Sequence, residues 1–276
     1  MGRVVLLWLG LAVWPAPALA VNVAHLDQAA WPGAAVTYAA LARAVFAGID
    51  GPGQAETWVT TREQVLRQPG TRQRTTLPAG SRLTGVEAFA VRGQGKAFGV
   101  TLWSFTGEAD TPGGGMAVLA LFPEGAAAPC DVVAVQTDAF CDALQGKTLP
   151  LGPGEAFFIR NHHSNSNQSY LSTGLYHVVS GRLRRIAEVF TLAVRADCRQ
   201  CFTETLDWRT APRPGTAYPD VTARVRLAPC SGCGGRKAAV RARTFAATSR
   251  FDAATGRYVA SGSGLAALDA FNEGNL

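Results

Sequence analysis

The spacing of apolar and polar residues changes character near Gly80. Before that point, apolar residues recur at helical spacing over residues 33–49, and Gly48 is placed to end the helix. A second, shorter helix is expected over residues 61–68, because Glu63 falls in its first turn and a proline follows it. The pattern therefore predicts a helical N-terminal segment over residues 21–80.

After Gly80, short apolar and β-branched runs alternate with glycine and proline clusters, which is typical of strands. Strands are expected at residues 85–91, 98–105, 116–122, 170–179, 183–194, 221–227 and 238–249. Glycine-containing turns at residues 93–95, 180–182 and 252–256 favour hairpins. A short helix is expected over residues 264–271. The fold class is therefore mainly β, an antiparallel sheet of meanders and hairpins with peripheral N-terminal and C-terminal helices, and its β-rich domain covers residues 81–276.

The first 20 residues follow the pattern of a secretory signal peptide. Arg3 precedes an apolar run over residues 4–13, and the small-x-small site Ala18-Leu19-Ala20 follows two prolines. The run is too short for a membrane anchor, which needs about 20 apolar residues. We expect cleavage before Val21, a periplasmic or secreted protein, and no transmembrane segment afterwards.

The apolar fraction is ordinary for a globular protein, so a packed core is expected, and the chain carries an excess of positive charge. Charged residues make up 17% of the chain, glycine is abundant, and the formal net charge is +6. The densest basic run, with Arg62, Arg67, Arg72 and Arg74, lacks the aromatic interleaving of a nucleic-acid surface and is better explained as a solvated face. No nucleic-acid partner is expected.

Six cysteines follow the predicted leader, and an even number in an exported chain favours structural disulfides. Cys198 with Cys201 and Cys230 with Cys233 form two Cys-x-x-Cys pairs. Disulfides between the two pairs are the leading interpretation, and a tetrahedral zinc site is the alternative. Thiol exchange is a third reading, but neither pair has the helix N-terminus that this chemistry uses.

Cys130 and Cys141 are expected to form a further structural disulfide. One unbroken strand between them would hold them about 30 Å apart, so a bond requires the chain to reverse near residues 136–138.

An up-and-down meander would bring both Cys-x-x-Cys pairs to the same end of a sheet as the loop over residues 161–169. This candidate ligand loop contains His162, His163, Asn165 and Asn167, whose side chains suit a metal or a polar ligand such as a sugar or peptide. A solvated turn is the plainer alternative, because asparagine and serine favour turns for backbone reasons. His177, within an expected strand, is interpreted as structural.

No phosphate-binding loop, metalloprotease helix or serine nucleophile elbow occurs in the chain. The leading functional hypothesis is an exported, non-enzymatic domain that binds an extracytoplasmic partner or a small polar ligand, or that serves a structural role at the envelope. It needs no cofactor. The alternatives are a zinc-binding protein that uses the two Cys-x-x-Cys pairs, and a hydrolase whose dispersed residues leave no local motif.

Overall fold

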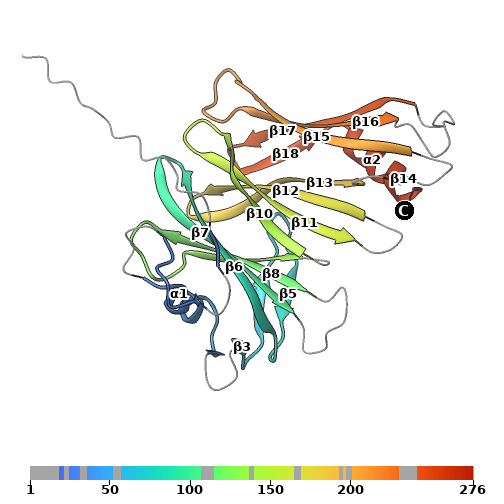
Figure 1. Ribbon diagram of the computed structural model, residues 1–276. Helices are drawn as coiled ribbons and strands as arrows, with labels where there is room; N and C mark the ends of the chain where they lie inside the picture. The colour runs from blue at the N-terminus through green and yellow to red at the C-terminus, as the bar shows by residue number, and fades with distance from the viewer. Residues whose placement is uncertain are drawn as a thin grey trace, which may run out of the picture.

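The chain folds into antiparallel β-sheets with one helix near each end of its described part (Figure 1). The computed structural model describes residues 19–21, 25–31, 36–51, 57–106, 115–136, 140–164, 169–192, 195–196, 201–229 and 241–275. The predicted mainly β fold class, with antiparallel pairing and two peripheral helices, is confirmed. The one parallel contact among the described strands joins Arg67 to Val133.

The first sheet contains nine described strands from the N-terminal half. They are β1 (Leu19–Val21), β2 (Ile49–Asp50), β3 (Val59–Thr60), β4 (Gln64–Arg67), β5 (Arg74–Leu77), β6 (Arg82–Gly93), β7 (Lys96–Thr106), β8 (Met116–Pro123) and β9 (Asp131–Gln136). The order across it is β2-β3-β6-β7-β8-β9-β4-β5, and β1 also pairs with β6.

The central strands of the first sheet are buried on both faces. In β8, Val118 and Phe122 face a core shared with the N-terminal helix, whereas Leu119 and Leu121 face the second sheet. A strand covered on both sides needs no polar face, which explains why β8 reads as a continuous apolar run.

The second half of the chain forms two further sheets, each a simple meander. The second sheet consists of β10 (Phe140–Pro150), β11 (Glu155–Ser164), β12 (Ser169–Val179) and β13 (Arg182–Leu192). The third consists of β14 (Arg195–Ala196), β15 (Cys201–Ala211), β16 (Asp220–Pro229), β17 (Arg243–Asp252) and β18 (Arg257–Ser261). The single predicted meander is therefore divided between two sheets, because the chain leaves the second sheet after Leu192.

The three sheets are stacked, with the second between the other two (Figure 1). Phe157 and Tyr176 of the second sheet pack on the first, and Phe158 and Leu175 on its other face pack toward the third. The C-terminal helix α2 (Gly264–Glu273) lies against β13 and β17, where its Leu268 is fully buried. Alternate residues of β11 and β12 therefore pack into two separate cores, one shared with the first sheet and one shared with the third.

All three predicted glycine-containing hairpin turns are confirmed. The turn with Gly256, whose φ is 63°, joins β17 to β18, and the other two are two-residue turns. Gln94 and Gly95 have φ values of 52° and 78°, and Ser180 and Gly181 have 52° and 67°. Two successive positive φ angles give the turn whose twist matches the flanking strands. These turns join β6 to β7 and β12 to β13.

The first predicted helix is present but shorter than expected. Helix α1 covers Tyr38–Val45, and the Thr37 side chain caps it by accepting a hydrogen bond from Ala40 N at 3.2 Å. The helix ends because Gly48, with φ of 81°, turns the chain into β2. Residues 33–35 of the expected helix lie outside the described residues.

The predicted helix over residues 61–68 is wrong, because this segment contains β4, which forms a hairpin with β5. Leu66 is buried in the first core, whereas Val65 is 55% exposed. Neighbouring residues on opposite faces are the signature of a strand. The apolar run is too short for periodicity alone to distinguish the two structures.

Residues 1–18 of the predicted leader lie outside the described residues. Leu19 pairs with Ala88 and Ala20 with Glu87 along β6, so cleavage after Ala20 would leave only Val21 of β1. Strand β6 would keep its pairing with β7. None of the described helices is long and apolar enough to cross a membrane.

Candidate functional site

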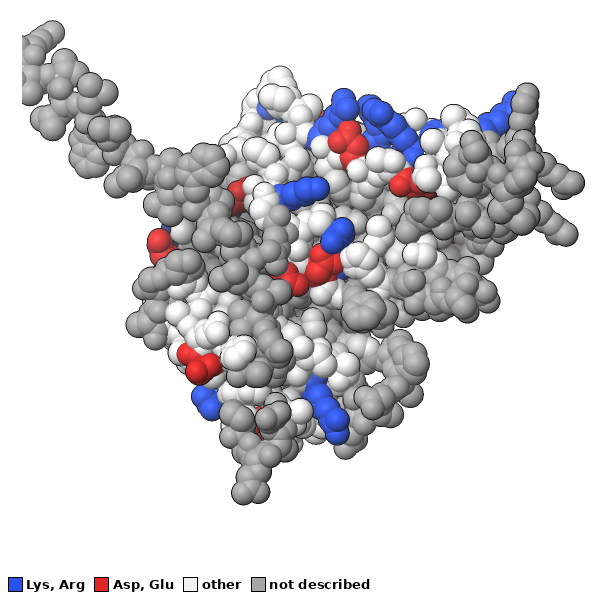
Figure 2. All heavy atoms as spheres, in the orientation of Figure 1, with Lys and Arg blue, Asp and Glu red and all other residues white. Residues whose placement is uncertain are grey.

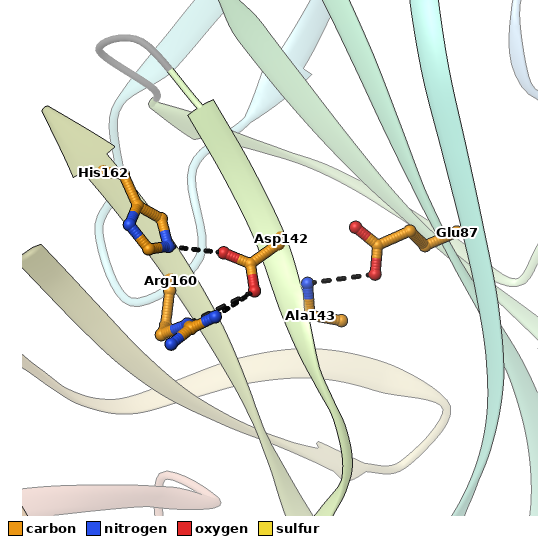
Figure 3. Close-up of polar contacts among 5 residues, drawn as sticks. All are labelled: Glu87, Asp142, Ala143, Arg160 and His162. Atoms are coloured by element: carbon orange, nitrogen blue, oxygen red, sulfur yellow. Dashed lines mark hydrogen bonds and ion pairs between the residues drawn. The ribbon is translucent and has the colours of Figure 1, made fainter. Parts of the chain in front are cut away.

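Three polar side chains meet on neighbouring strands at one end of the second sheet (Figure 3). Asp142 of β10 lies directly across the strand pair from Arg160 of β11, and His162 is two residues further along β11 on the same face. The Asp142 carboxylate accepts hydrogen bonds from Arg160 Nη2 at 2.7 Å and Nε at 3.2 Å through Oδ2. Its Oδ1 lies 2.7 Å from His162 Nε2.

The carboxylate determines how His162 is oriented. An ionised carboxylate only accepts hydrogen bonds, so the imidazole Nε2 carries the proton in this contact. That leaves Nδ1 to meet a ligand. Each of the three side chains is about one third exposed, so the group is reachable from solvent while it is held by rigid strands.

Glu87 approaches the same place from the first sheet, on the opposite side of β10 (Figure 3). Its Oε2 accepts a hydrogen bond from Ala143 N at 3.2 Å. The bond ties the backbone beside Asp142 to β6. The strand carrying Asp142 is thus fixed from both sides, which preorganises the polar group.

The Asp142–Arg160–His162 group lies at the end of the second sheet where the strands that flank the cysteine pairs also end. Tyr170, at the start of β12, pairs with Leu192, and Phe202 pairs with Pro229, the residue before Cys230. Leu192, Phe202 and Leu227 form one buried cluster, against which Tyr170 packs. The ends of the second and third sheets therefore lie together here.

The predicted ligand loop is shorter than expected. Strand β11 continues to Ser164 and β12 begins at Ser169, so His162 and His163 lie in a strand. Pairing between β11 and β12 supplies this extension, with Ser164 opposite Ser169. The His163 side chain, and all of Asn165 and Asn167, lie outside the described residues.

The two Cys-x-x-Cys pairs are only partly within the described chain. Cys201 begins β15 and pairs through its backbone with Ala196. Cys198, Cys230 and Cys233 lie outside the described residues, as does the Cys201 side chain. Within the described part of the chain, no group of three metal-ligating side chains occurs. The disulfide and zinc hypotheses for these cysteines both stay predictions.

The expected bond between Cys130 and Cys141 is not formed, because both carry free thiols. Cys130 precedes β9 and lies beside Gly181, at the turn between β12 and β13. Cys141 pairs with Asn161, which pairs with Ser172 far along β12. Ser172 and Gly181 are nine positions apart along this strand and its turn, or about 30 Å at about 3.3 Å per residue.

The histidine in β12 occupies the interior. His177 is 2% exposed and packs edge-on against Tyr258, with 5.3 Å between ring centroids. Burial, reinforced by the Arg184 guanidinium, lowers the pKa of His177 to about 3. His177 is therefore a neutral core residue at physiological pH.

Sequence reasoning missed Asp142 and Arg160. Neither belongs to a motif, and both lie in segments that were not expected to be strands. Only the register between β10 and β11 brings them to His162. No protein-family model, curated protein or solved structure matches the chain.

Proposed function

We propose that this protein is an exported β-domain that binds a small polar ligand or an extracytoplasmic partner, without catalysing a reaction. The observation that carries the proposal is the preorganised Asp142–Arg160–His162 group. Arg160 offers further guanidinium N–H donors, and His162 offers Nδ1, so together they suit a ligand with hydroxyl or carboxylate groups. Export is supported by the pattern of residues 1–20.

Binding is a better match than catalysis for the chemistry of these groups. An Asp–His pair activates a nucleophile only when a hydroxyl or thiol lies within hydrogen-bond reach of the imidazole. Among the described side chains, the polar partner of His162 is Asp142. The nearest thiol in sequence, Cys141, packs against the core between the first two sheets, on the other face of β10.

The proposal is tested by NMR titration of the purified protein with named probes: glucose, N-acetylglucosamine, glucuronate and a short mixed peptide. We expect at least one probe to shift the resonances of Arg160 and His162, and His162→Ala to weaken its binding by about tenfold, as loss of a hydrogen bond to a charged group implies. His25→Ala, which alters an exposed histidine elsewhere, should leave binding unchanged. The proposal would be contradicted if no probe shifted the resonances of Arg160 or His162.

A further inference from the structure

The outward face of the third sheet is polar and uncovered by any described element. Along β16, Val221, Ala223, Val225 and Leu227 are buried, and the residues between them point outward. The outward side chains of β15, β16 and β17 are threonines, arginines and aspartates, with small residues between them. An open face of this kind is free to meet a partner.

Strand register places Arg224 and Arg226 at the centre of this face. Arg224 lies between Asp207 of β15 and Ala246 of β17, and Arg226 lies between Thr205 and Thr244. Two residues apart on one strand, the arginines project to the same side with about 7 Å between them. They form a short row of positive charge, in which Arg226 is flanked by a threonine on each neighbouring strand.

Two aspartates of this face, Asp207 and Asp220, are paired with other arginines. Arg209 Nε donates to Asp207 Oδ2 at 2.8 Å, and Arg250 Nε donates to Asp220 Oδ2 at 3.3 Å. Neither Arg224 nor Arg226 forms an ion pair within the described part of the chain. Their charge is therefore available to an anionic partner.

Along the sequence, basic residues are concentrated in the segment that contains β16 and β17. Residues 221–251 contain seven Lys and Arg residues and no Asp or Glu, whereas the rest of the chain has 19 basic against 20 acidic residues. Figure 2 shows Lys and Arg gathering along the edge of the molecule that β15 to β17 occupy. Exposed Arg243 extends the positive region at the start of β17.

We propose that this basic face, defined by Arg209, Arg224, Arg226 and Arg250 with their flanking threonines, binds an acidic polysaccharide. A flat row of guanidinium groups suits a linear polymer with repeated carboxylate or sulfate groups, because the planar fork matches such anions. Threonine hydroxyls can bond sugar hydroxyls between the charges. This surface is separate from the Asp142–Arg160–His162 group, so the inference does not rest on the proposed function.

Other polyanions match the face less well. Binding of single-stranded nucleic acid uses aromatic side chains on which bases stack, and the described outward residues of β15 to β18 include none. Peripheral membrane binding uses several apolar side chains beside the basic ones. Among the described residues of this face, Val259 is the only large apolar side chain that is exposed.

The test is isothermal titration of the full chain with heparin, a sulfated and carboxylated polysaccharide. The double variant R224Q/R226Q should weaken binding by at least about tenfold, because two charge-assisted contacts are removed. The variant R224K/R226K should retain most of the affinity. Wild-type binding should also fall between about 50 mM and about 300 mM NaCl, because salt screens exposed charges.

The matched control is R72Q/R74Q, which removes the same charge from exposed positions in the first sheet's hairpin region. It should change the heparin affinity by less than about twofold, since these side chains lie outside the basic face. Equal weakening by the control would show that only net charge matters and would overturn the proposal.

The identity of the partner is tested with other polyanions. If anionic phospholipid vesicles or single-stranded DNA bound more tightly than heparin, and R224Q/R226Q abolished that binding, the polysaccharide would be overturned as partner. Loss of heparin binding in R160Q/H162A, but not in R224Q/R226Q, would move the binding site to the second sheet.

Discussion

Asn272 is a buried polar residue that joins the C-terminal helix to the second and third sheets. Its side chain is fully buried, and Nδ2 donates to Phe190 O at 3.1 Å and to Glu204 Oε2 at 3.2 Å. The same Glu204 oxygen accepts a hydrogen bond from Leu192 N at 2.9 Å. Burial raises the pKa of the Glu204 carboxyl, and these two donors oppose that rise.

Replacing Asn272 with alanine should lower the free energy of unfolding by about 1–3 kcal/mol, because buried acceptors lose their donor. The lost bond favours ionised Glu204, so its removal raises the pKa of that carboxyl further. The folded state then binds protons more readily than the unfolded state, and stability recovers as the pH falls through the folded pKa. Urea denaturation at neutral and acidic pH measures both effects. Asn275→Ala, which removes only a bond to Phe271 O at the helix end, is the control; an equal loss there would contradict the role of Asn272.

The partners of Asp142 could not be predicted from the residues next to it in the sequence. His162 is conspicuous in the sequence because a second histidine and several asparagines follow it. Asp142 and Arg160 have no such neighbours, and their contact exists because β10 and β11 pair in one register. A shift of that register by one residue would turn Asp142 to the other face of the sheet.

At the scale of elements, the C-terminal helix is held by the close approach of its first residue to β17. A Cβ atom on Gly264 would lie 2.0 Å from Ala246 O, a backbone atom that cannot swing away. At the other end of the helix, a Cβ on Gly274 would meet nothing nearer than Ala270 O at 3.6 Å. Gly264 is therefore required by the packing of the helix on β17, whereas the surroundings of Gly274 leave room for a side chain.

We expect Gly264→Ala to destabilise the protein by about 1–3 kcal/mol, because the helix must move away from β17. In an unobstructed helix, the same change would stabilise by up to about 1 kcal/mol. Thermal unfolding followed by circular dichroism gives the comparison. Gly274→Ala should be neutral or slightly stabilising, and a stabilising Gly264→Ala would show that the helix does not pack this closely.

At the scale of the whole molecule, the stacking of the first two sheets decides which thiols are reactive. Cys130 is exposed, whereas Cys141 packs against the core between these sheets. Burial, followed by the carboxylates of Asp142, Glu87 and Glu188, raises the pKa of Cys141. Reaction with an alkylating agent requires the thiolate, so Cys141 should be protected as long as the sheets stay together.

Iodoacetamide labelling, mapped by peptide mass spectrometry, tests this arrangement together with the predicted disulfides. In the native protein, Cys130 should label at least about tenfold faster than Cys141, since burial and a raised pKa both slow the reaction. Denaturant without reductant should expose Cys141 but leave the four Cys-x-x-Cys residues unlabelled if they form disulfides. Labelling of those four after a chelator alone, with bound zinc released, would favour the metal site instead. Equal native rates for Cys130 and Cys141 would contradict the packing.

What the sequence determined by itself is local. Alternating side chains and glycine turns predicted a mainly β fold, the turns at Gln94–Gly95 and Ser180–Gly181, and the C-terminal helix, because strand period and backbone φ depend on neighbouring residues. Tertiary structure decided the rest. It made a strand of β4 through pairing with β5, divided the meander between two sheets, brought Asp142 to His162, and left Arg224 and Arg226 on an open face. Periodicity shows which residues share a face, but what that face packs against depends on contacts between residues far apart in the chain.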